Sequence, residues 1–142
     1  MIFTLDTNVV VDALRQPAEL DRLKAFLSWA LPSTVLSSVV AAELTAGART
    51  EKARLVLAGA LLAPFERRGR IVAPTAGAWR QMSIVLAQWS TSGVSASRQN
   101  DALLAAQARE HGWTIITRDQ DFQVLRSHIG GLRVIVPFPD RP

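Results

Sequence analysis

The sequence predicts an α/β protein whose central sheet is parallel and covered by helices on both faces. Short apolar strands alternate with longer segments in which apolar residues recur at helical spacing. This alternation is typical of strand–helix–strand units joined by right-handed crossovers. The 142 residues suit one domain, 1–142, with a sizeable core, and no linker, repeat or low-complexity tract indicates a second domain.

The expected strands are short and apolar, and they are Ile2–Leu5, Thr34–Ser37, Ile71–Ala73, Trp113–Thr117 and Leu132–Val136. The expected helices are Asn8–Arg15, Leu20–Leu31, Val39–Ala48, Glu51–Phe65, Thr75–Ser90, Asp101–Glu110 and a short one over Phe122–His128. Within the first helix, Val9–Val11 also fits a strand, because β-branched residues favour strands. The polar segment TSGVSASRQN, residues 91–100, is expected to be a loop.

Composition limits the classes of protein that fit. A content of 49% hydrophobic and 20% charged residues indicates a globular chain, and the absence of cysteine excludes disulfides and thiolate metal sites. The start has no basic leader, and the longest apolar stretch, Val56–Phe65, is too short to span a bilayer. We therefore expect a soluble cytoplasmic protein with no membrane partner. The net charge of +4 is a weak indication of an anionic partner such as nucleic acid.

Four acids come from separate segments that border the expected strands. Asp6 ends the first strand, and Asp119 follows the fourth. Glu43 lies in the first turns of the helix after the second strand, and Asp101 starts the helix before the fourth strand. Because ligands bind outside the carboxyl ends of the strands in such sheets, we expect the four acids to share one rim.

Each acid also has a simpler explanation when it is taken alone. Asp6 fits a helix N-cap, Asp101 fits a charge at a helix start, and Asp119 fits a turn. Glu43 is harder to explain in this way, because the segment VVAAELTAGA around it is otherwise small and nearly apolar, and burial of an unpaired carboxylate is costly. The shared location of the four acids is what favours a functional site.

Clustered carboxylates need a counter-charge, and an all-oxygen ligand set suits Mg²⁺ or Mn²⁺. Zinc fits poorly, because there is no cysteine and His111 and His128 are expected away from the rim. Without the four acids, the chain keeps sixteen basic and eight acidic residues. An acidic pit on a basic surface suits a phosphodiester substrate, for which a metal ion activates water and stabilises charge on a phosphoryl oxygen.

The four acids stand in motifs that resemble a known family: LDTN with Asp6, AAEL with Glu43, RQNDALLAAQAREHG with Asp101 and ITRDQDF with Asp119. In this order they look like the acidic motifs of PIN-domain ribonucleases, especially the VapC-like toxins of type II bacterial toxin–antitoxin pairs. The resemblance covers nearly the whole chain. It implies a three-layer α/β/α sandwich and a Mg²⁺- or Mn²⁺-dependent endoribonuclease, a hydrolase of RNA. It also implies a homodimer that a cognate antitoxin inhibits.

The resemblance also implies roles for individual residues. By motif match, the catalytic and metal-binding residues are Asp6, Glu43, Asp101 and Asp119, and Asn8 and Thr117 support them by orienting carboxylates or water. Asp121 is either an extra acid or a solvated turn residue. Asp12 is expected at the surface.

Two further features concern the partners of the chain. Arg98 stands beside Asp101 in the Ser-rich segment and is the best candidate for a phosphate contact with the substrate. Glu51–Phe65 has a broad apolar face that fits either core packing or a groove for an antitoxin helix.

Other functions compete with the ribonuclease. A phosphatase of the haloacid-dehalogenase type would use Asp6 as a nucleophile, but it needs Asp-x-Asp after the first strand, and Asn8 occupies the third place. A housekeeping nuclease of the same family and a non-catalytic nucleic-acid-binding module, in which the acids are structural, remain as alternatives.

Overall fold

A computed structural model describes residues 1–89, 96–136 and 138–142. The strands form one parallel sheet in the order β3-β2-β1-β4-β5. Their bounds are Phe3–Leu5 for β1, Thr34–Ser37 for β2, Ile71–Val72 for β3, Thr114–Ile116 for β4 and Arg133–Ile135 for β5. Phe3 in β1 pairs with Thr34 of β2 on one side and Thr114 of β4 on the other. The carboxyl ends of these central strands therefore lie next to one another.

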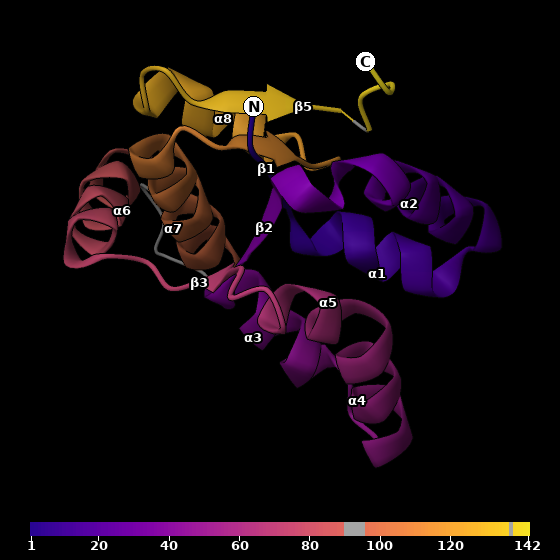
Figure 1. The fold of residues 1–142 in the computed structure, drawn as a ribbon. Helices are drawn as coiled ribbons and strands as arrows, with labels where there is room; N and C mark the ends of the chain where they lie inside the picture. The colour runs from indigo at the N-terminus through magenta and orange to yellow at the C-terminus, as the bar shows by residue number, and fades with distance from the viewer. Residues whose placement is uncertain (90–95, 137) are drawn as a thin grey trace.

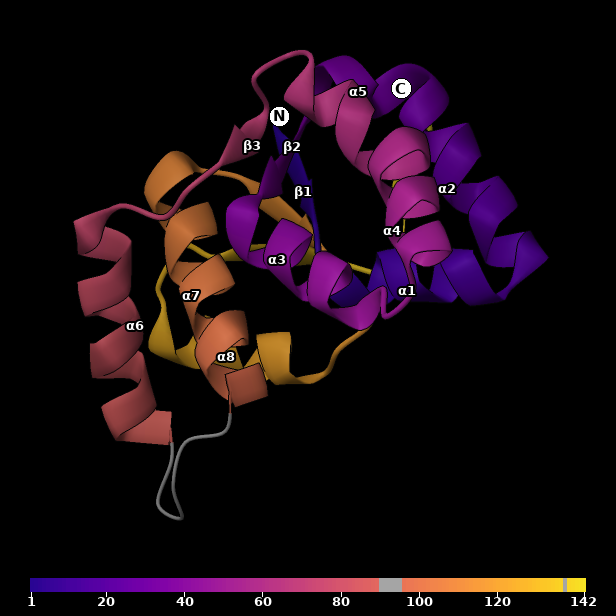
Figure 2. The same cartoon turned by 90° about the horizontal axis from the view of Figure 1, so that it is seen from below.

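Helices cover both faces of the sheet (Figure 1). In chain order they are α1 Thr7–Arg15, α2 Pro17–Ala30, α3 Ser38–Gly47, α4 Glu51–Leu57, α5 Ala63–Glu66, α6 Ala76–Trp89, α7 Ala96–His111 and α8 Asp121–His128. Figures 1 and 2 show α6, α7 and α8 on one side of the sheet and α1 and α2 on the other. The predicted α/β/α sandwich with a central parallel sheet is therefore confirmed. In the described part of the chain, no helix is long and apolar enough to cross a membrane.

Two helices begin directly at the carboxyl ends of strands, because the residue between strand and helix acts as an N-cap. The Asp6 carboxylate accepts a hydrogen bond from the Thr7 N–H at 2.8 Å, and the Ser37 hydroxyl accepts one from the Val39 N–H at 3.2 Å. Such caps satisfy N–H groups that have no partner within the helix. As a result, β1 leads into α1 and β2 leads into α3 without a loop.

The start of α7 differs from the prediction. We expected a loop over residues 91–100 and a helix from Asp101, but α7 begins at Ala96 and Asp101 lies in its second turn. The expected loop thus falls partly on residues 90–95, outside the described residues, and partly on the helix. The residues Ala96, Arg98 and Gln99 all favour helices, which explains why the helix starts before the acid. Gly112, with φ at 71°, follows its last residue, His111, as expected for a helix end.

The segment predicted as one helix over Glu51–Phe65 contains an irregular turn. A π-helical stretch, η2, spans Ala58–Leu62 between α4 and α5. Pro64 explains this position, because proline has no N–H and cannot donate to the carbonyl group four residues earlier. A short 3₁₀ helix, η1 Leu31–Ser33, likewise replaces the end of the helix expected up to Leu31.

The most deeply buried helix is α7. Its small and branched apolar residues are nearly inaccessible, namely Ala102, Leu103, Leu104, Ala105, Ala106 and Ala108. Gln107 is also fully buried, where it accepts a hydrogen bond from the Ser37 hydroxyl at 2.5 Å and donates one to the Val72 carbonyl at 2.9 Å. These bonds fix α7 to β2 and β3 and thereby set the position of the helix that carries Asp101.

Candidate metal centre

Three carboxylates converge at the carboxyl edge of the sheet. Asp6 comes from the end of β1, Asp101 from the second turn of α7, and Asp119 from the connection after β4. One carboxylate oxygen of each lies within 4.8 Å of the other two. The side chains of Asp6 and Asp101 are nearly buried, with only 4% and 8% of these residues exposed. The cluster is therefore held by the sheet and by the most buried helix.

Asp6 is oriented by two hydrogen bonds. Its Oδ1 accepts from the Thr7 N–H at 2.8 Å, and its Oδ2 accepts from the Thr117 hydroxyl at 2.7 Å. Because Thr117 directly follows β4, this second bond ties the end of β1 to the end of β4 across the site.

The Thr117 hydroxyl is a junction of several bonds. It donates to Asp6, and it accepts from the Asn8 amide at 3.3 Å and from the Asp119 N–H at 3.0 Å. The side-chain amide oxygen of Asn8, Oδ1, in turn accepts from the Arg118 backbone N–H at 3.4 Å. Thr117 thus contacts Asp6 and Asp119 directly, whereas Asn8 reaches the site through its bonds to Thr117 and Arg118.

Glu43, on α3, stands beside this cluster but outside the group of three. Its Oε1 accepts a hydrogen bond from the Thr7 hydroxyl at 2.9 Å. Its charge is close enough to raise the pKa of both Asp6 and Asp101. Thr7 therefore connects Asp6, through its N–H, with Glu43, through its hydroxyl.

Burial and crowding both raise the pKa of the central acids. Burial is the largest cause for Asp6, with Glu43 and Asp119 adding to it and the bonds from Thr117 and Thr7 opposing it, and its pKa is about 6 instead of 3.8. The pKa of Asp101 is raised to about 8, first by burial and then by the neighbouring acids Asp6, Asp119, Glu43 and Asp121. Ionisation of these groups therefore lowers the free energy of unfolding unless a cation binds between them.

The donor set fits a hard divalent cation. The three carboxylates, whose oxygens lie within 4.8 Å of one another, supply only oxygen ligands, which Mg²⁺ and Mn²⁺ prefer. Over residues 1–89, 96–136 and 138–142, the salt bridges join Arg22 and Arg118 to Asp12 and Glu19. None of these salt bridges involves an acid of the cluster. His111 stacks on Trp113 and lies about 15 Å from Asp101 along α7, so imidazole plays no part here.

The remaining candidates from the sequence are Asp121 and Arg98. The Asp121 N–H donates to Asp119 Oδ1 at 2.9 Å, and the charge of Asp121 raises the pKa of Asp101. Arg98 lies in the first turn of α7, with its guanidinium group 4.9 Å from the centre of the Trp89 ring. The expected placement of Arg98 in a loop is therefore wrong, because α7 begins before it.

One set of contacts near the site was missed by the sequence prediction. Arg118 binds Asp12, on α1, and Glu19, on α2, although Asp12 was expected to be a surface residue without a role. No local signal in the sequence marks this pairing, because the partners are separated by about a hundred residues. Only the neighbouring position of Arg118 to Asp119, within the motif ITRDQDF, could have drawn attention to it.

Comparisons with known proteins show the family to which the chain belongs. The family model of the PIN domain matches residues 3–127, so the chain belongs to the PIN domain family, whose members are generally nucleases. Proteins with curated descriptions give no match.

Several solved structures share the fold of this chain. DNA-bound VapBC from Salmonella typhimurium has a chain with a TM-score of 0.70 and 21% identity, covering 96% of this chain and 98% of that one. FitAcB from Neisseria gonorrhoeae gives a TM-score of 0.68 and 23% identity, covering 94% and 96%. A toxin–antitoxin complex from Klebsiella pneumoniae gives 0.66 and 19%, covering 97% and 99%. At these identities the likeness concerns the fold.

Proposed function

We propose that this protein is a Mg²⁺- or Mn²⁺-dependent endoribonuclease that acts as the toxin of a toxin–antitoxin pair. The observation that carries the proposal is the meeting of Asp6, Asp101 and Asp119 within 4.8 Å at the carboxyl edge of a PIN domain. Four separate segments of the chain contribute to this acidic site when Glu43 is included. A purely structural role does not explain why three carboxylates are kept together where burial and neighbouring acids raise the pKa of Asp6 and Asp101.

In this proposal, Asp6, Asp101 and Asp119 would hold the metal ion, which would supply positive charge to the phosphoryl oxygens and lower the pKa of a bound water. Thr117 orients the Asp6 carboxylate and accepts from the backbone N–H of Asp119, and Asn8 supports Thr117 by a hydrogen bond to its hydroxyl. Glu43, fixed at one oxygen by Thr7, accepts the proton of the attacking water. As the water oxygen bonds to phosphorus, the bond to the leaving ribose oxygen breaks and solvent protonates that oxygen. Arg98, three residues before Asp101 on α7, is the proposed phosphate contact, with Asp121 as an additional acid.

The purified protein should cleave single-stranded RNA in millimolar Mg²⁺ or Mn²⁺ and show no cleavage in chelator. The reason is that the carboxylates cannot by themselves neutralise charge on a phosphoryl oxygen. Gel analysis of a labelled RNA after incubation in each condition measures this. Internal cuts in a circular RNA identify the activity as endonucleolytic. Cleavage that continues undiminished in chelator would contradict the metal site.

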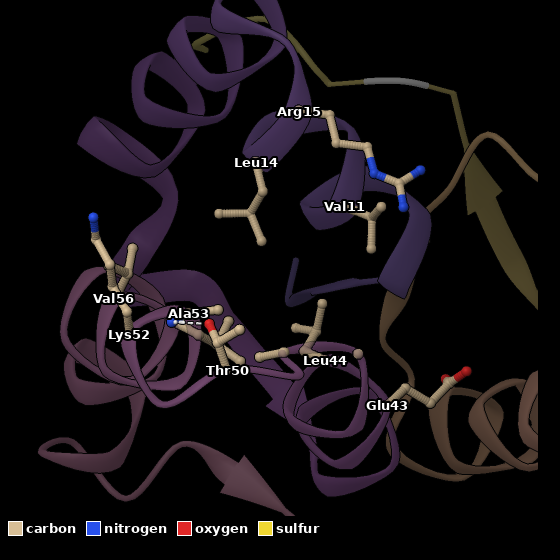
Figure 3. A pocket seen from close by; sticks show the side chains of 12 residues that line it. Val11, Leu14, Arg15, Glu43, Leu44, Thr50, Lys52, Ala53 and Val56 are labelled. Atoms are coloured by element: carbon tan, nitrogen blue, oxygen red, sulfur yellow. Dashed lines mark hydrogen bonds between the residues drawn. The ribbon is translucent and has the colours of Figure 1, made fainter.

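A groove beside the acidic site supports the antitoxin as partner. A cavity of about 470 Å³ lies between α1, α3 and α4. Figure 3 shows Val11, Leu14 and Leu44 facing this space, with Arg15 at its border and the Glu43 carboxylate directed away from it. An amphipathic helix fits a groove of this kind. The solved structures with the same fold include toxin–antitoxin complexes, which supports a cognate antitoxin as the occupant.

The helical segment Glu51–Glu66 divides its apolar residues between two uses. Leu57, Leu61, Leu62 and Phe65 are buried in the core, as one of the two interpretations of the sequence requires. Val56, by contrast, is 52% exposed and lines the groove. Leu55, next to it, is 68% exposed and lies outside the groove lining, so the pair offers a test site and a matched control.

Expression of the wild type alone should arrest growth, and co-expression with the antitoxin encoded beside it should restore growth. Val56→Glu should weaken this rescue and raise the Kd for the antitoxin at least about tenfold, because it places a charge in an apolar groove. Leu55→Glu, with the same charge one residue away, should leave rescue unchanged. Colony counts and calorimetric titration measure both effects. A host that grows normally while it produces soluble wild type would favour the housekeeping nuclease or the binding module.

A homodimer, implied by the family resemblance, is part of this proposal. On α6, Trp79 and Ile84 are 47% and 48% exposed, and exposed apolar side chains of this kind are available for subunit contacts. Of the competing functions, the phosphatase has the least support, because the amide of Asn8 stands where it needs a second acid and is bonded to Thr117.

A further inference from the structure

The connection between β4 and α8 carries Asp119, whose carboxylate accepts a hydrogen bond from the Asp121 N–H, at the start of α8, at 2.9 Å. Thr117 still bonds to β5 through its N–H, and α8 begins at Asp121. The Asp119 carbonyl oxygen also accepts a hydrogen bond from the Phe122 N–H of α8 at 3.3 Å. Between Thr117 and α8, the connection is further held by side chains, because the Thr117 hydroxyl accepts from the Asp119 N–H and Asn8 Oδ1 accepts from the Arg118 N–H.

Arg118 provides the strongest of these contacts. Its guanidinium group donates to Asp12 Oδ2 at 3.0 Å and to Glu19 Oε2, so that one side chain binds both α1 and α2. The side chain of Glu19 is only 11% exposed, and that of Arg118 is 27% exposed. A planar guanidinium group held by two carboxylates from two helices has little freedom to turn. The two ion pairs therefore restrain residue 118 by attaching its side chain to α1 and α2.

The two neighbouring side chains diverge. Arg118 extends to Asp12 and Glu19, whereas Asp119 extends to Asp6 and Asp101. A rotation of this backbone that moves Asp119 out of the cluster also displaces Arg118, so the two ion pairs with Asp12 and Glu19 oppose it. The ion pairs thus act on the metal centre through the backbone, without a contact to it.

We propose that Arg118 is a positioning residue that sets the metal affinity of the site by holding Asp119 toward Asp6 and Asp101. The inference rests on the proposed function only in that the cluster binds a divalent metal ion, and it does not depend on RNA as substrate. A direct phosphate contact is the competing role for an arginine beside the site. The geometry disfavours it, because the guanidinium group is already engaged by Asp12 and Glu19.

Mn²⁺ binding to the RNA-free protein, followed by electron paramagnetic resonance, tests the inference. Arg118→Met keeps most of the aliphatic chain and removes the charge, and it should raise the Kd for Mn²⁺ at least about tenfold, as loss of groups that orient metal ligands typically does. The double variant Asp12→Asn with Glu19→Gln leaves Arg118 in place but removes its partners. It should raise the Kd in the same direction, and it serves as the test if Arg118→Met fails to fold.

Arg22→Met is the matched control. Arg22 also binds Glu19, at 3.1 Å, but its side chain is 63% exposed and lies far from Asp119 in sequence. Its loss should leave the Kd within about twofold, since exposed ion pairs contribute little. Melting temperatures in chelator separate the proposed role from simple stabilisation.

Several results would overturn the inference. One is a lower melting temperature of the Arg118 and double variants with an unchanged Mn²⁺ Kd, which indicates a structural ion pair only. Another is a raised KM for RNA in Arg118→Met with an unchanged Mn²⁺ Kd, which indicates a phosphate contact. Wild type that binds no Mn²⁺ would also overturn it. If the wild type binds Mn²⁺ with the expected changes among the variants but cleaves no RNA, the inference holds and the proposed nuclease activity fails.

Discussion

Replacement of Asp101 by asparagine is expected to lower the rate of RNA cleavage by at least about 100-fold at saturating Mg²⁺. The change keeps the size of the side chain and one oxygen, but it removes a charge from the three carboxylates that lie within 4.8 Å of one another. The Asp6→Asn variant should lose as much activity, because its oxygen atoms are held toward the same point by Thr7 and Thr117.

The loss of activity must be distinguished from unfolding of the variants, and melting temperatures in chelator make this distinction. Each substitution removes a carboxylate that burial and neighbouring acids disfavour, so neither variant should melt at a lower temperature than wild type in chelator. Asp21→Asn, on the exposed side of α2, is the control and should keep full activity. Full activity of Asp6→Asn or Asp101→Asn would exclude this cluster as the catalytic centre.

The sequence predicted the strands well because their boundaries have local causes. β2 spans Thr34–Ser37 as predicted, since Pro32 precedes it and Ser37 caps the next helix. Asp6, a carboxylate at the end of a buried strand, has two roles in the structure. Asp6 both caps α1 and belongs to the cluster. The simpler explanation and the functional one are compatible, because the carboxylate that caps α1 also has an oxygen within 4.8 Å of an oxygen of Asp101 and of Asp119.

Features that depend on tertiary contacts could not be predicted in this way. The pairing of Arg118 with Asp12 and Glu19 joins three segments that periodicity treats separately. The bonds of Thr117 to Asp6, Asn8 and Asp119 likewise exist only once β4 lies beside β1.

The metal-free protein is expected to lose stability as the pH rises through the range in which its central acids titrate. The pKa of Asp6 is raised from 3.8 to about 6, and that of Asp101 from 3.8 to about 8. In this range the folded protein holds protons that the unfolded chain has released. The free energy of unfolding therefore falls with pH. The contribution of these two groups is complete below pH 3.8 and is lost as the pH rises to about 8.

Mg²⁺ should reverse this loss, because it binds the converged carboxylates of the folded protein and not the unfolded chain. The effect should be largest near pH 8, where the folded cluster carries the most uncompensated charge. Thermal melts from pH 5 to pH 8.5, in chelator and in millimolar Mg²⁺, measure both trends. Other acids also titrate below pH 5, so a variant that changes the cluster alone is needed to assign the effect.

Asp119→Asn is that variant. It removes one charge from the cluster, and the amide oxygen can still accept the Asp121 N–H bond that Asp119 Oδ1 accepts in the wild type. In chelator at pH 7 it should melt roughly 2–4 °C above wild type, which corresponds to about 1 kcal/mol for a chain of this size. It should also gain less from Mg²⁺, because it has lost a ligand. Asp21→Asn should follow the wild type in every condition, and equal melting temperatures for Asp119→Asn and wild type, with and without Mg²⁺, would show that these carboxylates do not act as one site.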